Sequence, residues 1–236
     1  MINSNFSFYG LAILLALVGN IIVIISQYKK YNYNLEEIVC LLLFENTGII
    51  IGAKILSYFL LDDKQKSFVE LGLASYGAVA GAILFIFLFC VRYKKNIKET
   101  IYLFTPSFPL MYSIGKIGCF IVGCCHGIEY NGLFKIMYKY SIKAPNNVYL
   151  FPVQIVESII FFIIFMYLII MQKKNKFNDK TFGIALIMCG IAKGSLDFLR
   201  AEGTQLFTFS KIVSLLVIIA GIAYIFIMKK VTKTKK

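Results

Sequence analysis

The chain has 236 residues, 59% of them hydrophobic, and its mean hydropathy is +0.77. Several apolar runs reach the roughly 20 residues that a membrane-spanning helix needs, which excludes an ordinary soluble domain. The formal net charge of +13 comes mostly from lysines in short clusters between these runs. The charge therefore carries information about membrane topology and does not indicate a nucleic-acid partner.

Seven apolar runs predict seven transmembrane helices in a single all-α transmembrane domain that covers residues 1–236. The first run lacks the basic start and the small-residue cleavage pattern of a signal peptide, so we expect it to be retained. The fourth run contains Pro106 and Pro109, and because proline removes a helical hydrogen bond we expect this helix to be bent or broken. The runs cover residues 6–26, 38–61, 71–91, 101–125, 151–171, 181–199 and 209–228.

Basic residues gather on alternate loops, near residues 29–30, 92–98 and 173–180 and in the C-terminal tail. By the positive-inside rule these loops face the cytoplasm, which places the N-terminus outside and the C-terminus inside. The longest outer segment, residues 126–150, follows an unusual glycine-rich stretch. We expect this segment to cover a site as a lid.

The glycine-rich stretch, residues 115–127, reads G-K-I-G-C-F-I-V-G-C-C-H-G. A cation in an apolar segment costs about 2.5–3.5 kcal/mol on insertion scales, so Lys116 needs a wet cavity or an anionic partner. Glycines such as Gly118 allow a backbone or a lipid head group to approach closely. We interpret this stretch as the wall of a site.

Three charged residues of the sixth predicted helix have helical spacing. Lys193, Asp197 and Arg200 are at positions i, i+4 and i+7, which places them on one face. Such a face suits a phosphate group if Asp197 orients one cation and the remaining positive charge meets an anionic ligand. The alternative is a structural ion pair that locks two helices together.

Polar residues on two other helices have competing interpretations. Gln154 and Glu157 are at i and i+3, where they contact a ligand or form interhelical hydrogen bonds. Gly77 and Gly81 have the G-x-x-x-G spacing that favours close helix packing. That interpretation leaves Tyr76 as the functional candidate on the third helix.

Most of the six cysteines fall inside hydrophobic segments, so we expect no disulfide framework. Cys119, Cys124, Cys125 and His126 give neither a C-x-x-C pair nor a standard zinc spacing, and adjacent cysteines on a helix point in different directions. We therefore expect no metal and no other cofactor. His126, the only histidine, is a candidate acid or base at the membrane edge.

Six short motifs occur in an order and spacing that resemble the prolipoprotein diacylglyceryl transferases of bacterial membranes. They are Y-G-L at Tyr9, G-A-K at Gly52, Y-G-x-x-x-G at Tyr76, G-K-I-G at Gly115, P-x-Q-x-x-E at Pro152 and K-x-x-x-D-x-x-R at Lys193. The resemblance implies seven helices with the N-terminus outside. It also implies transfer of a diacylglyceryl group from phosphatidylglycerol to the lipobox cysteine thiol of a preprolipoprotein, with release of glycerol phosphate, in the bacterial cytoplasmic membrane.

The resemblance also implies roles for individual residues. The essential arginines of the family fall on Lys116 and Lys193, its glutamate falls on Asp197, and the arginine of its G-A-R motif falls on Lys54. Arg200 is retained. The implied catalytic residues are Lys116, Lys193, Asp197, Tyr76 and His126. The implied contacts with phosphatidylglycerol are Lys116, Lys193, Arg200, Lys54, Tyr9, Gly77, Gly118, Gln154 and Glu157.

The chain departs from the family pattern at several polar positions. Tyr76 replaces a histidine that serves as a proposed base, Cys119 and Val122 replace two asparagines, and Phe151 replaces another histidine. A lysine ammonium also lacks the planar bidentate fork of arginine. These departures leave two alternatives open, a non-catalytic lipid-binding or transport paralogue and a transferase that acts on another lipid or thiol.

The expected chemistry is attack of a thiolate on the glyceryl carbon, with phosphate as the leaving group and no required metal. The surrounding cations favour the thiolate. The proton acceptor is open among His126, Tyr76 with its high reference pKa, and no dedicated base at all.

The lysine clusters lead to a test of topology. Single cysteines introduced at Lys64 or Asn131 should react with a membrane-impermeant thiol reagent added to intact cells, because both positions lie on loops assigned to the outside. Cysteines at Lys95 or Lys176 should react only after lysis. The parent protein, labelled in parallel, corrects for its own thiols. The reverse pattern of labelling contradicts the orientation.

Overall fold

The computed structural model describes residues 4–60, 74–141, 143–201 and 208–234. Within these residues, six helices are long and apolar enough to cross a membrane, which confirms a polytopic helical membrane protein. The count of seven and the orientation stay predictions. The chain divides into two compact units, residues 21–104 and residues 1–20 with 105–236. The single domain stays a prediction.

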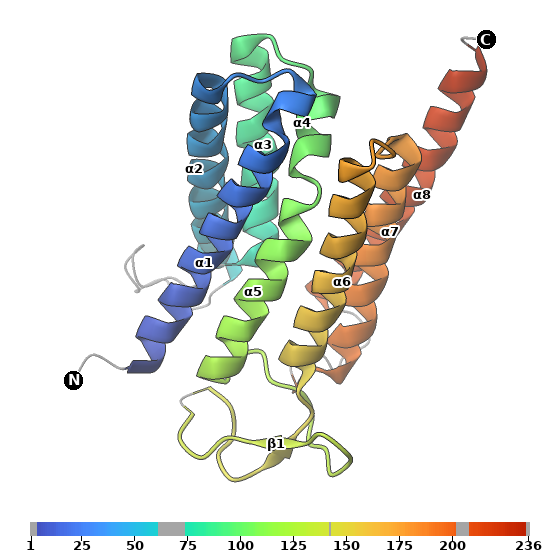
Figure 1. Ribbon diagram of the computed structural model, residues 1–236. Coiled ribbons are helices and arrows are strands. Elements are labelled where there is room, and N and C mark those ends of the chain that lie inside the picture. Colours follow the sequence, from blue (N-terminus) through green and yellow to red (C-terminus); the bar gives the residue numbers. More distant parts are fainter. Residues whose placement is uncertain (1–3, 61–73, 142, 202–207, 235–236) are drawn as a thin grey trace. The chain divides into compact units, whose positions relative to one another are not determined.

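The unit of residues 21–104 is built around a helix pair. The end of α1 (Ser4–Gln27) leads through a 3-10 turn, η1 (Tyr28–Tyr31), into α2 (Leu35–Leu60), and α3 (Ser75–Tyr93) and α4 (Ile97–Phe104) follow. Helices α2 and α3 lie side by side (Figure 1). Large apolar side chains fill the core next to them, among them Ile24, Ile38, Leu41, Phe89 and Leu103. The expected ends of the second and third runs, at residues 61 and 71–73, lie outside the described residues.

Four glycines bring α2 and α3 into backbone contact. A Cβ atom on Gly52 would collide with the carbonyl oxygen of Gly77, and one on Gly48 would collide with that of Gly81. The collisions are reciprocal, since a Cβ atom on Gly77 would meet the carbonyl oxygen of Gly52 and one on Gly81 would meet that of Gly48. The packing role expected of Gly77 and Gly81 is therefore present in the structure.

The predicted fourth helix is broken, as expected from its prolines. Helix α4 ends at Phe104, and α5 (Ser107–Val122) begins directly after Pro106. Proline disfavours a helical conformation in the residue before it, here Thr105, which explains the position of the break. Pro109 lies in the first turn of α5, where a missing N–H donor leaves no hydrogen bond unmade.

The other unit contains four further helices and a small sheet. Helices α5, α6 (Val153–Lys173), α7 (Asp179–Leu196) and α8 (Phe209–Thr234) pack in chain order, and η2 (Asp197–Leu199) extends α7 by a 3-10 turn. Strands β1 (Ile136–Met137) and β2 (Tyr149–Leu150) pair antiparallel between α5 and α6. The core between α6 and α7 contains Phe161, Ile164, Leu168, Ala185 and Ala192.

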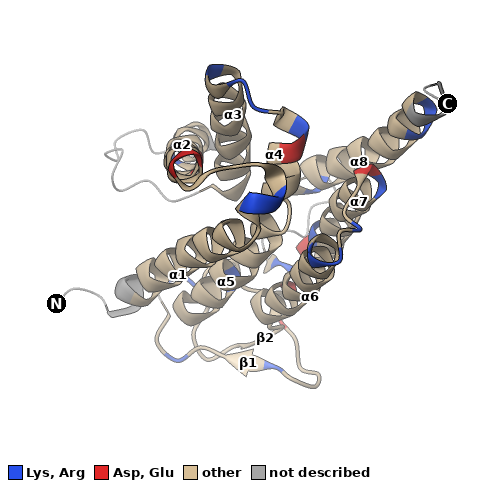
Figure 2. Cartoon of the chain, turned by 45° about the horizontal axis from the view of Figure 1, so that its top comes forward, with Lys and Arg blue, Asp and Glu red and all other residues tan. Residues whose placement is uncertain are grey.

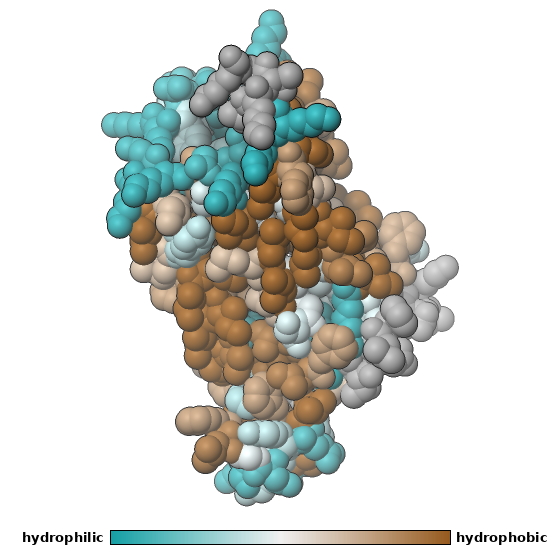
Figure 3. All heavy atoms as spheres, turned by 90° about the vertical axis from the view of Figure 1, so that its right-hand side faces the viewer, coloured by the Kyte–Doolittle hydropathy of each residue, from teal (hydrophilic) through white to brown (hydrophobic). Residues whose placement is uncertain are grey.

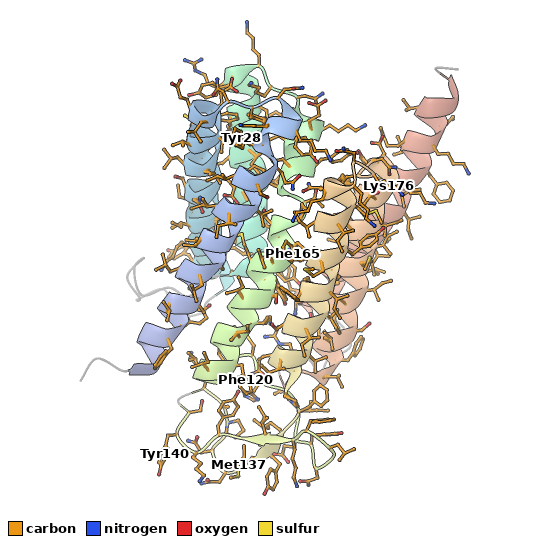
Figure 4. All side chains as sticks on the ribbon, in the orientation of Figure 1. Tyr28, Phe120, Met137, Tyr140, Phe165 and Lys176 are labelled. Carbon is orange, nitrogen blue, oxygen red and sulfur yellow. The ribbon has the colours of Figure 1, made fainter. Side chains whose placement is uncertain are left out.

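Figure 4 places Lys176 and the β1 segment at opposite ends of this unit, with Met137 and Tyr140 on the β1 segment and Phe120 at the adjoining end of α5. The Tyr138 hydroxyl donates to the Phe120 carbonyl at 2.9 Å, which ties the segment to the helix. Residues 137 and 176 therefore lie at opposite ends of the unit, in agreement with the predicted alternation of loops.

Charged and apolar residues separate along the helices of this unit. Long stretches of α6, α7 and α8 carry neither basic nor acidic residues, and charges gather near helix ends (Figure 2). On the α8 side, apolar side chains form a broad band with hydrophilic side chains at both of its ends (Figure 3). This is the pattern of helices that face hydrocarbon in their middle and water at their ends.

The glycine contacts lead to a stability test. Gly81→Leu should lower the melting temperature in detergent, because overpacking a tight contact costs about 1–3 kcal/mol. Gly10→Ala is the matched control, since a Cβ atom there meets nothing within 4 Å. Equal melting temperatures for the two variants would contradict backbone contact between α2 and α3.

Candidate functional site

Five charged residues form one buried group in the unit of residues 1–20 and 105–236, which we call the five-charge cluster. Its members are Lys116 on α5, Glu157 on α6, Lys193 on α7, Asp197 in η2 and Arg200 just after η2. Glu157 is fully buried, and no more than 8% of Lys116, Lys193 or Asp197 is exposed. Helices α5, α6 and α7 and the turn η2 thus each contribute one charge, and Arg200 follows directly after η2.

The signs of the charges alternate along the cluster. Glu157 lies between two lysines, with its Oε2 2.5 Å from Lys116 Nζ and its Oε1 3.3 Å from Lys193 Nζ. Lys193 also forms an ion pair with Asp197 one helical turn away. Arg200 Nη1 lies 3.4 Å from Asp197 Oδ1 and completes the series. The one-face arrangement predicted for Lys193, Asp197 and Arg200 is therefore observed.

Two hydroxyl groups complete the shell of the carboxylates. The Tyr112 hydroxyl donates to Glu157 Oε1 at 3.1 Å, and the Tyr112 ring lies 5.1 Å from Lys116 Nζ. The Ser210 hydroxyl, at the start of α8, donates to Asp197. Sequence reasoning missed both residues. The position of Tyr112 four residues before Lys116 was an available signal, whereas Ser210 gave none.

The five-charge cluster has three cations and two carboxylates, so one positive charge is in excess. Each buried charge has an opposite neighbour, which offsets the several kcal/mol that an isolated buried ion costs. Burial by itself lowers the pKa of Arg200, but the negative charges of Cys125, Glu157 and Asp197 outweigh burial and raise it. Arg200 therefore stays cationic. Its side chain, 15% exposed, is the most accessible of the five.

A short backbone pairing fixes the position of Arg200. Ile128 N–H donates to the Leu199 carbonyl at 3.0 Å, and Ala201 N–H donates to the His126 carbonyl at 3.1 Å. The chain just after α5 is thus bonded to the chain just after η2. The His126 ring places Nδ1 3.2 Å from the Gly127 carbonyl oxygen, and its role as a base stays a prediction.

Three other predicted residues, Gln154, Gly118 and Tyr9, belong to this unit. Gln154 is buried one turn before Glu157 and donates to the Cys124 carbonyl at 3.0 Å, which is a structural hydrogen bond. A Cβ atom on Gly118 would meet Ala12 and Tyr9, so this glycine allows α1 to approach α5. Contact of these residues with lipid stays a prediction.

Lys54, Tyr76 and Gly77 belong to the unit of residues 21–104. Gly77 packs against Gly52, while Lys54 and Tyr76 are each half-buried. Their predicted roles toward phosphatidylglycerol or in catalysis are therefore left as predictions.

Three cysteines lie together at the end of α5. The Sγ atoms of Cys119, Cys124 and Cys125 are all within 4.8 Å of one another, a group that can hold a metal ion. Hydrogen bonds from Cys119 and Cys124, assisted by the positive charges of Arg200 and Lys116, lower the pKa of the Cys125 thiol. The expected divergence of Cys124 and Cys125 on a helix does not apply, because α5 ends at Val122.

Comparison with known proteins gives a consistent result. The family described as "Prolipoprotein diacylglyceryl transferase" matches residues 2–227. A phosphatidylglycerol–prolipoprotein diacylglyceryl transferase of Clostridium tetani is 30% identical over 91% of this chain and 90% of its own length. Proteins with that name from Clostridium perfringens (there numbered 2) and Finegoldia magna are 29% and 27% identical, each over 91% of this chain and 88% of its own length. The chain belongs to the prolipoprotein diacylglyceryl transferase family.

Proposed function

We propose that this protein transfers a diacylglyceryl group from phosphatidylglycerol to the lipobox cysteine thiol of a preprolipoprotein in the bacterial cytoplasmic membrane. The family match over residues 2–227 supports the reaction, and the names of the relatives supply both substrates. The observation that carries the proposal is the five-charge cluster, a buried group with one positive charge in excess.

The cluster suits the head group of this lipid by charge. A phosphodiester carries one negative charge, which matches the excess of the cluster. Arg200 presents its guanidinium at the most exposed end, where its planar fork can hold two phosphate oxygens. Lys116 and Lys193 supply positive charge from the buried side. Asp197 and Glu157 orient these cations.

The reaction forms one bond and breaks another. The acceptor thiol loses its proton, its sulfur attacks the glyceryl carbon, and the bond from that carbon to the phosphate oxygen breaks. Glycerol phosphate leaves with the bonding electron pair, so the negative charge on the phosphate group grows from one to two. Cations already in place stabilise that growing charge without reorganisation, which is usually the largest catalytic contribution.

The direct test supplies purified protein with phosphatidylglycerol and a lipobox peptide and searches for the diacylglyceryl thioether by mass spectrometry. The same peptide with serine in place of cysteine is the control, because its hydroxyl is a far weaker nucleophile than a thiolate. Phosphatidylglycerol bound without any thioether would support the non-catalytic alternative. A thioether made only from another lipid would change the assigned donor.

Removal of either buried lysine charge should abolish transfer. Lys116→Met and Lys193→Met keep the length of the side chain and remove its charge, and loss of one such electrostatic contribution costs about 100- to 1000-fold in rate. Initial rates of thioether formation measure the effect. Near-normal rates in both variants would contradict phosphate binding by the cluster.

Matched controls separate catalysis from folding. Lys116→Met leaves Glu157 with one cation, and breaking a buried ion pair costs about 3–5 kcal/mol, so the melting temperature is measured for each variant. Lys116→Arg should retain activity, because it keeps the charge and introduces the residue expected in the family. Lys176→Met, at an exposed position far along the unit, should leave transfer unchanged.

We expect His126→Gln to leave the pH profile of transfer unchanged. The His126 backbone carbonyl accepts a hydrogen bond from Ala201, and its ring Nδ1 lies next to the Gly127 carbonyl. Cations near the site already favour a thiolate. If His126 were the base, the variant would lose the part of the pH dependence that His126 contributes. Rates from pH 5 to 9 for both proteins distinguish these outcomes.

A further inference from the structure

The three cysteines at the end of α5 form a compact group of sulfur atoms. All three Sγ atoms lie within 4.8 Å of one another, and all three residues are half-buried free thiols. Cys119 occupies one of the positions where the family resemblance expects asparagine. Where the family resemblance expects the polar side chain of asparagine, this chain thus has a thiol, which lies close to the thiols of Cys124 and Cys125.

Local backbone geometry brings the sulfurs together. Gly123 adopts a left-handed conformation with φ 78°, and its N–H donates to the Cys119 carbonyl at 2.9 Å, which ends the helix. Cys125 is also left-handed, with φ 54°. A non-glycine residue in this region is uncommon and points to a constrained turn. The Gln154 side chain holds the Cys124 carbonyl from α6.

We propose that Cys119, Cys124 and Cys125 form a thiolate site for a thiophilic metal ion, with zinc(II) as the occupant and one coordination position open. Sulfurs bound to one zinc at about 2.3 Å are about 3.8 Å apart in a tetrahedron. The observed limit of 4.8 Å is close enough for small side-chain rotations to close the site.

The surrounding charge favours such a site. Three thiolates and one zinc(II) carry one net negative charge, and the five-charge cluster beside them has one positive charge in excess. Cys119 follows Lys116 by three residues on α5, and a β-bridge pairs Gly127, two residues after Cys125, with Arg200. The two groups therefore lie close together. The cations of the cluster thus offset part of the negative charge at the metal site.

The fourth coordination position of the zinc ion is open to a ligand from outside the protein. Of the His, Cys, Asp and Glu side chains that the structure describes, the group within 4.8 Å comprises the three sulfurs alone, so three protein ligands leave the fourth position free. Three ligands and an open position are typical of catalytic zinc. We assign the open position to the acceptor thiol, and this step rests on the proposed function.

Binding of the acceptor thiol to zinc would remove the need for a protein side chain that accepts its proton. A thiol that binds zinc is deprotonated outright, so the acceptor loses its proton to solvent as its sulfur joins the metal. That sulfur would then attack the glyceryl carbon as before, its bond to zinc would break as the thioether forms, and glycerol phosphate would leave. This chain has Tyr76 where the family resemblance expects a histidine base. A metal-held thiolate makes that base unnecessary.

The first experiment measures metal binding without any lipid. Reduced, purified full-length protein receives zinc, passes through a weak chelator, and is analysed for zinc and sulfur by mass spectrometry. We expect one zinc per chain in the parent and in Cys189→Ala, a control on α7 away from the group. Cys119→Ser and Cys124→Ser should lose it. No retained zinc in the reduced parent, or equal zinc in Cys124→Ser, would overturn the site.

Cobalt(II) absorption keeps the test decisive if a serine variant does not fold. Cobalt bound to the parent protein should give sulfur-to-metal charge-transfer bands in the near ultraviolet, and their absence would overturn a thiolate site. Adding a lipobox peptide in the absence of phosphatidylglycerol should then shift the visible bands, whereas its serine counterpart should not. Equal spectra with both peptides would overturn the open position and leave the metal site standing.

The transfer assay distinguishes failure of the metal site from failure of the proposed transfer reaction. Cobalt spectra that respond to the cysteine peptide in a protein that makes no thioether would support the metal site and its thiol ligand while the proposed reaction fails. Transfer at full rate in Cys124→Ser, or in protein stripped of metal, would overturn the assignment of the acceptor thiol to the metal while the proposed reaction stands.

Discussion

The contact of Glu157 with two lysines is the interaction on which the rest of the site depends. Glu157 is fully buried on α6 and forms ion pairs with Lys116 of α5 and Lys193 of α7, so one carboxylate joins three helices. Without it, two ammonium groups would face each other in an apolar setting. Asp197 likewise forms ion pairs with two cations, Lys193 and Arg200, which lie close to it in sequence.

Local chemistry made part of this structure predictable. Proline restricts its own φ angle and the residue before it, so the break at Pro106 could be predicted without any tertiary information. The spacing of Gly77 and Gly81 indicated helix packing, and the spacing of Lys193 and Asp197 placed both on one face. Each of these predictions depends on residues close together in sequence.

The unpredicted parts depend on contacts between elements or on the end of a helix. Nothing in the sequence pairs Lys116 with Glu157, because 41 positions separate them and their partnership exists only after α5 and α6 pack. The fourth helix is predicted to continue to Cys125 because the sequence stays hydrophobic up to that residue. Gly123, in its left-handed conformation, ends that helix earlier, and the turn that follows gathers the cysteines.

The shortness of α5 has a consequence for the surrounding bilayer. Its 16 residues measure about 24 Å at 1.5 Å per residue, which is less than the roughly 30 Å of the hydrocarbon core. A helix shorter than the hydrocarbon core is accommodated by local thinning of the bilayer, by snorkelling of flanking side chains or by association with other helices. Where the bilayer thins beside α5, the head group of a donor lipid has less hydrocarbon to cross before it reaches the depth of Lys116.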